Sequence, residues 1–183
     1  MLFRSGEASE HFVMGYIRFA HFSAAYIFTL AMIGRAYWAL VGNHHARELF
    51  SVPLTSKAYW ADMSAWMRYY LFIGPTPTPM FGHNPLSRFA MFFIFLLTSL
   101  FMILTGFALY GEGAQMGSWQ ERTFGWVLPL LGQSNNVHVL HHLGMWVIVL
   151  FVMSHIYAAV REEINGRLSL VGSMISGYKT FKK

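Results

Sequence analysis

The sequence predicts an all-α integral membrane protein, a helical bundle with three spanning helices and one helix in the membrane interface. Two observations predict this fold class. The 183 residues are 55% hydrophobic and only 11% charged, whereas an average soluble domain is about 25% charged. The apolar residues also gather in runs longer than the roughly 20 helical residues that cross a bilayer. We expect residues 1–183 to form a single membrane domain.

Three apolar runs are long enough to span the bilayer, at about 12–41, 89–110 and 137–160. The second run carries no charged residue at all, which excludes a soluble enzyme because a charge-free run of this length is typical of a transmembrane helix. A further segment, at about 58–73, combines aromatic and charged side chains at helical spacing. Such a segment is typical of an amphipathic helix that lies along the membrane surface.

The distribution of lysine and arginine predicts how the chain is oriented. The 42–88 loop carries four of these residues and the C-terminal tail carries five, whereas the 111–136 loop carries one. Loops on the cytoplasmic side are enriched in lysine and arginine. We therefore expect the 42–88 loop and the tail in the cytoplasm, with residues 1–12 and 111–136 outside. The net charge of +5 then reflects membrane topology, and we expect no nucleic-acid partner.

Histidines inside the apolar runs are the candidate functional residues. The chain has no cysteine, which excludes iron–sulfur clusters and covalently attached c-type haem. His21, His141 and His155 lie within the predicted spans, where ionisable side chains are costly and usually functional. Each one taken alone is also compatible with a hydrogen bond between helices, so a haem site is predicted only from their spacing.

The spacing of these histidines favours two haem levels across the membrane. His141 and His155 return to within about 40° of the same helix face and lie about 21 Å apart along the axis, which excludes a shared zinc site. The first and third spans are parallel, so His21 lies level with His141. We predict that His21 and His141 ligate a haem near the outer face, and that His155 lies near the cytoplasmic face without a partner. Arg18 either pairs with a haem propionate or reaches the interface.

The remaining histidines are weaker candidates. His138 lies at the outer level, on the wrong side of the membrane to partner His155. His142 points about 100° away from His141 on a helix. The histidines expected outside the spans and exposed to water are His11, His44, His45 and His83.

Several motifs resemble the b-type cytochrome subunit of membrane-bound nickel–iron hydrogenases. They are residues 14–23 (MGYIRFAHFS), 82–85 (GHNP), 102–110 (MILTGFALY), and 141–146 (HHLGMW) followed by 155–157 (HIY). The last motif, with its second histidine 14 residues after the first, is the most specific. The resemblance runs from about residue 6 to the tail.

The resemblance implies four spanning helices and two haems b. In the family the first helix begins with an Arg-x-x-His-Trp motif, whose histidine ligates the inner haem. This sequence lacks that motif and resembles the family from just before its second helix onward. By resemblance, the haem b site of His21 and His141 is complete, whereas the inner site at His155 lacks its second ligand.

The resemblance also implies a role in a respiratory chain of the bacterial inner membrane. The chain would be an electron-transfer subunit, with the hydrogen chemistry on another subunit. Electrons would leave the hydrogenase small subunit, which docks with the large subunit on the periplasmic face, and pass through haem b to membrane quinone. Two alternatives remain: a cytochrome b subunit of another dehydrogenase, such as formate dehydrogenase, and a membrane scaffold or transporter without haem.

Overall fold

The computed structural model describes residues 12–47, 50–77, 83–114, 116–165, 172, 173, 176 and 177. The regular elements assigned within these residues are all helical, as the sequence predicts. Three stretches are long and apolar enough to cross a membrane: α1 (Val13–Val41), the continuous stretch Pro85–Gly113, and α8 (Ser134–Asn165). The three predicted spans are therefore confirmed, and the second and third extend past their predicted limits at both ends.

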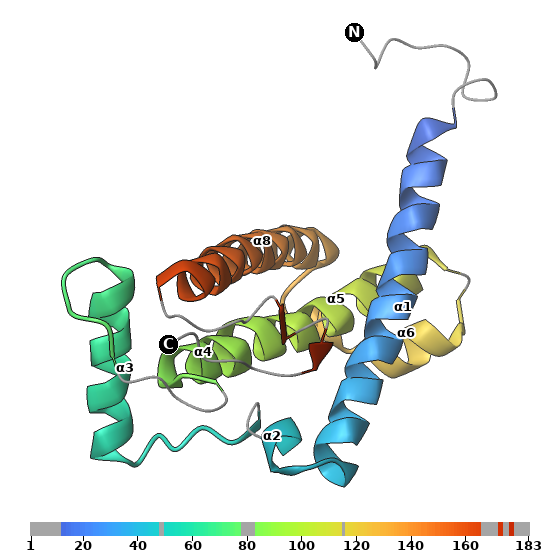
Figure 1. The fold of residues 1–183 in the computed structure, drawn as a ribbon. Coiled ribbons are helices and arrows are strands. Elements are labelled where there is room, and N and C mark those ends of the chain that lie inside the picture. The colour runs from blue at the N-terminus through green and yellow to red at the C-terminus, as the bar shows by residue number, and fades with distance from the viewer. Residues whose placement is uncertain are drawn as a thin grey trace, which may run out of the picture. The chain divides into compact units, whose positions relative to one another are not determined.

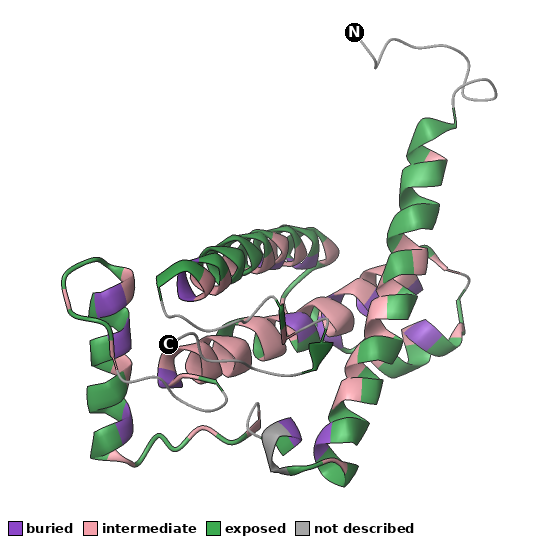
Figure 2. Ribbon diagram, in the orientation of Figure 1, coloured by how far each residue is buried: buried purple, intermediate pink, exposed green. Residues whose placement is uncertain are grey.

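The chain divides into two units, Met1–Val41 and Gly42–Lys183. Helix α1 belongs to the first unit, and its side chains are exposed or half-buried almost throughout (Figure 2). Ala39 is the buried residue of this helix. Taken by itself, α1 presents apolar side chains on every side, as expected for a helix surrounded by lipid or by other spanning helices.

The second span is built from three helical segments in succession. It begins with α4 (Pro85–Phe89), passes through the π-helical segment η2 (Ala90–Leu96) and ends with α5 (Leu97–Gly113). The Asn84 side chain accepts a hydrogen bond from the backbone N–H of Ser87 at 2.7 Å, and Pro85 occupies the first turn, where no N–H is needed. Asn84 and Pro85, the last two residues of the 82–85 motif, therefore begin the second span.

Helix α8 runs beside this second span (Figure 1). A Cβ added at Gly144 would lie 2.6 Å from Met102 Sδ, and one added at Gly106 would lie 3.2 Å from His141 Cε1. The two glycines therefore let α5 and α8 approach closely, which is the usual device of packed membrane helices. Further along, Phe95 and Phe151 stack with centroids 5.2 Å apart.

The predicted interfacial helix is α3 (Lys57–Tyr70), and Figure 1 shows it running steeply across the direction of α5 and α8. Its end has the hydrogen bonds of a Schellman motif: Ile73 N–H donates to the Arg68 carbonyl, and Phe72 N–H donates to the Tyr69 carbonyl. Phe72 has φ +62° at the position that usually requires glycine. The centre of its ring lies 3.8 Å from the guanidinium carbon of Arg161 in α8.

Three short helices complete the second unit: α2 (His44–Arg47), α6 (Trp119–Phe124) and α7 (Val127–Leu130). The 111–136 segment is expected to be a loop between spans, but α6 begins within it. The reason is local, because Ser118 caps the helix by accepting a hydrogen bond from Glu121 N–H. Phe107 of α5 stacks on Phe124 at 5.1 Å, which holds α6 against the end of the second span.

Candidate functional site

His141 is held directly against α5. Its Nδ1 atom lies 2.8 Å from the hydroxyl oxygen of Thr105, a residue with no exposed surface. Its Cε1 atom faces Gly106, the next residue of α5. A larger residue at position 106 would push the imidazole away, so the motif around 102–110 builds one wall of the His141 environment.

His155 lies 14 residues further along α8, about 21 Å away along the helix axis. Its ring stacks on Phe151 with centroids 5.6 Å apart and an interplanar angle of 20°, and Phe151 stacks in turn on Phe95. These stacked rings, next to the π-helical segment, limit how the His155 ring can turn. The structure therefore places His141 and His155 near opposite ends of the contact between the second span and α8.

His155 lines a cavity of about 810 Å³ between α3, α4, η2 and α8. Sites for drug-sized ligands and cofactors are typically about 300–1,000 Å³ and mostly apolar, with a few polar groups. The apolar part of this wall includes Met91, Ile94 and Leu150. The cavity is therefore large enough for a flat aromatic group beside the imidazole.

A polar chain crosses one wall of the cavity. Asn84 Nδ2 donates a hydrogen bond to the Tyr70 hydroxyl at 3.3 Å, and that hydroxyl donates to the Glu162 carboxylate. Burial and the nearby Glu162 charge raise the pKa of the Tyr70 phenol, so this phenol stays protonated at neutral pH. The 82–85 motif contains Asn84 but gives no sign of its contact to Tyr70, because this contact spans 14 residues and exists only in the folded chain.

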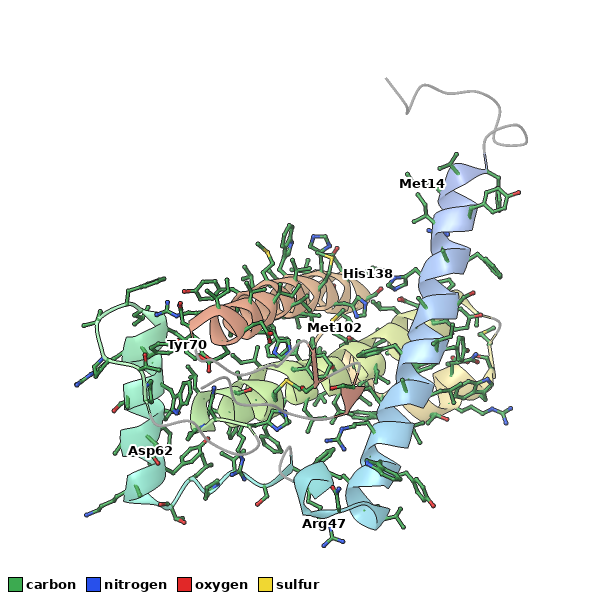
Figure 3. All side chains as sticks on the ribbon, viewed as in Figure 1. Met14, Arg47, Asp62, Tyr70, Met102 and His138 are labelled. Atoms are coloured by element: carbon green, nitrogen blue, oxygen red, sulfur yellow. The ribbon has the colours of Figure 1, made fainter. Side chains whose placement is uncertain are left out.

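Arg161 fastens α3 to the end of α8. Its guanidinium donates hydrogen bonds to the backbone carbonyls of Tyr69 and Tyr70, the latter at 3.2 Å, and lies 4.4 Å from the centre of the Tyr69 ring. The Tyr70 carbonyl ends a helix and lacks a partner within it, whereas the Tyr69 carbonyl also accepts a hydrogen bond from Phe72 N–H. Figure 3 shows Tyr70 at this end of α3. Sequence reasoning counted Arg161 only as a charge of the tail, whereas the structure buries it to 8% exposure.

His21 and Arg18 lie in α1, one helical turn apart. The His21 ring meets Phe22 edge-on at 5.9 Å, and both His21 and Arg18 are exposed within the first unit. The pairing of His21 with His141 joins the two separately described units and remains a prediction.

The remaining histidines differ in their surroundings. His138 is exposed and its Nδ1 atom lies 3.0 Å from the Ser134 carbonyl of the same helix; Figure 3 marks its position on α8. His142 is exposed and meets Trp146 edge-on at 6.4 Å. His83 is exposed, as expected, but it also lines the cavity of His155. His11 and the side chains of His44 and His45 lie outside the described residues.

Comparison with known proteins shows the family. A family model described as prokaryotic cytochrome b561 matches residues 1–177. A probable Ni/Fe-hydrogenase B-type cytochrome subunit of Cupriavidus necator is 67% identical over 98% of this chain and 73% of that protein. The chain belongs to the family of Ni/Fe-hydrogenase B-type cytochrome subunits. Its relatives include the subunit of Azotobacter vinelandii, 55% identical over 97% of this chain and 74% of that protein. Another is the Ni/Fe-hydrogenase 1 B-type cytochrome subunit of Escherichia coli, 44% identical over 97% of this chain and 76% of that protein.

Membership of this B-type cytochrome family implies haem b, and the residues present fit such a group. Imidazole nitrogen is the usual protein ligand of b-type haem iron. Close approach of α5 at Gly106 fixes the His141 ring, and His155 opens onto the cavity of about 810 Å³. Both imidazole rings thus have a defined place in the fold. Haem is a rigid macrocycle, so the side chains that ligate it need such a defined place.

Proposed function

We propose that this subunit passes electrons from the hydrogenase small subunit through haem b to membrane quinone. The observation that carries the proposal is the placement of two histidines on α8, near the two ends of its contact with the second span. His141 contacts Thr105 of α5, whereas the exposed His155 ring stacks on Phe151. This arrangement supports two redox positions across the membrane, and membership of the cytochrome family supports haem as the group they hold.

In this proposal His21 and His141 would hold the iron of a haem near the outer face. When bound, haem b supplies reversible one-electron oxidation and reduction of its iron. Arg18 lies one turn before His21 and provides a guanidinium for a propionate carboxylate. His155 and the cavity beside it provide an inner haem position, whose second ligand is not assigned.

The proposed orientation places the hydrogenase small and large subunits on the periplasmic face of the bacterial inner membrane. The 111–136 segment would face that side. The 42–88 loop and the C-terminal tail would face the cytoplasm. The contact of Arg161 with the end of α3 supports this assignment, because it brings the 42–88 segment and the end of α8 to the same end of the second unit.

The first experiment is a dithionite-reduced minus oxidised spectrum of the purified chain, with haem content per chain. We expect a b-type spectrum with about one haem per chain, which is lost in His141→Ala because an axial ligand is removed. The matched control is His138→Ala, three residues earlier in the same helix, where the exposed ring contacts its own helix. Its spectrum should equal that of the wild type.

Activity measurements on the assembled hydrogenase test the electron path. His141→Ala should abolish hydrogen-dependent quinone reduction and leave hydrogen oxidation with a soluble dye unchanged, because the hydrogen chemistry lies on another subunit. Loss of the dye reaction as well would contradict the proposed division of roles. A wild-type chain without haem would favour the scaffold alternative, and co-purification with formate dehydrogenase would identify a different partner.

A further inference from the structure

One buried hydroxyl group contacts a proposed haem ligand. Thr105 Oγ1 lies 2.8 Å from His141 Nδ1, although the two residues are 36 positions apart in the sequence. The same oxygen lies 2.7 Å from the Phe101 carbonyl, one turn earlier in α5. Thr105 has no exposed surface, so water does not compete for either contact.

The contacts of Thr105 with Phe101 and His141 determine where the protons lie, and its third contact, to the Met102 carbonyl at 3.4 Å, is longer. A hydroxyl group has one proton to donate and can accept through its lone pairs. A carbonyl oxygen only accepts, so the Thr105 proton points to the Phe101 carbonyl, as is common for threonine in helices. The hydroxyl oxygen can then meet His141 Nδ1 at 2.8 Å only as an acceptor. A neutral His141 is therefore protonated on Nδ1 and carries its lone pair on Nε2.

We propose that Thr105 is a positioning residue that holds His141 in the Nδ1-protonated form, with Nε2 as the atom that ligates haem iron. The proposal rests on the proposed role of His141. Histidine ligands of metals usually donate their second N–H to a nearby acceptor, which orients the ring and strengthens the ligand. Gly106, next to Thr105, faces His141 Cε1, so consecutive residues of α5 set both the protonation and the position of the ring.

The test compares Thr105→Val with Thr105→Ser in the purified chain. Valine keeps the shape of threonine but removes the acceptor, whereas serine keeps the hydroxyl group. In Thr105→Val we expect about 10–100-fold weaker haem retention, the usual effect of removing such a partner. The midpoint potential of the haem that remains should rise, because a weaker imidazole donor stabilises ferric iron less. Thr105→Ser should behave like the wild type.

A second readout requires no haem at all. With ¹⁵N-labelled histidine, the apo wild type and Thr105→Ser should show His141 protonated on Nδ1, and Thr105→Val should show a mixture of tautomers. The matched control is Thr98→Val, in which the threonine lies seven residues earlier on the same face of α5. This variant should match the wild type in haem retention and in potential.

The outcomes separate this inference from the proposed function. Unchanged retention, potential and tautomer in Thr105→Val would overturn the inference while leaving His141 as a ligand. Equal haem loss in Thr105→Ser and Thr105→Val would overturn it too, because serine keeps the hydroxyl group and side-chain packing at position 105 would then be responsible. Haem that survives in His141→Ala would overturn the proposed ligand itself and the inference with it.

Discussion

The two histidines of α8 have different surroundings at the level of single residues. The His141 ring is held at a nitrogen atom by Thr105, whereas the His155 ring is held through its face by Phe151. The Thr105 hydroxyl determines which nitrogen of His141 carries a proton. Phe151 contacts the face of the His155 ring, so the two nitrogens of His155, at the edge of that ring, take no part in the contact. We therefore expect the two positions to respond independently to substitution.

A substitution of His155 tests this independence. We expect His155→Ala to keep the haem of His21 and His141, with about one haem per chain whether the wild type binds one or two. The two rings of α8 lie about 21 Å apart along the axis, and substitutions at such separations usually act additively. The measurement is haem content together with a redox titration. Complete loss of haem in His155→Ala would contradict the assignment of ligands.

At the level of elements, close backbone contacts determine how the short helices pack. A Cβ at Gly111 would lie 2.8 Å from the Glu121 backbone nitrogen, and other backbone atoms of α6 lie almost as near. Backbone atoms cannot move aside as a flexible side chain can. At Gly113, two residues later in α5, an added Cβ would have no atom of another described segment within 4 Å, so the two glycines form a matched pair.

We expect Gly111→Ala to destabilise the protein by about 1–3 kcal/mol, since overpacking forces the backbone to shift. Gly113→Ala should be neutral or stabilising by up to about 1 kcal/mol, because alanine favours the helix. Thermal unfolding in detergent, followed by circular dichroism, measures both variants. Equal melting temperatures for the two variants would show that α6 does not pack on Gly111 as described.

At the level of the whole molecule, the membrane topology depends on which segments lie on the same side of the membrane. Arg161 joins the end of α3 to the end of α8, and Phe107 joins α6 to the other end of the second span. The 42–88 segment and the 111–136 segment therefore lie at different ends of the second unit. This separation agrees with the predicted loops, and the absolute orientation remains a proposal.

Single cysteines can determine that orientation, because the natural chain has none. We expect Met116→Cys, at a position with 95% exposure, to react with a membrane-impermeant maleimide in intact spheroplasts. Lys57→Cys, at an exposed position of α3, should react only after the membrane is permeabilised. The wild type serves as the unlabelled control. The opposite pattern would reverse the proposed topology and place hydrogenase docking on the other face.

The fold class, the three spans and the family could be predicted from the sequence. Long apolar runs must form helices in a bilayer, because each backbone polar group needs a partner within its own segment. The histidines stood out for the same reason, since His21, His141 and His155 are costly inside such runs. These conclusions depend only on residue type and local spacing, which are visible in the chain before it folds.

The tertiary structure decided which side chains surround the histidines of α8. The contact of Thr105 with His141, the Asn84–Tyr70–Glu162 chain and the burial of Arg161 all join residues from different helices. The hydrophobic pattern of α5 and α8 requires only that they pack and does not determine which residues meet, because both helices are apolar on every side. Close approach at Gly106 and Gly144 selects one arrangement, and that arrangement places the Thr105 hydroxyl beside His141.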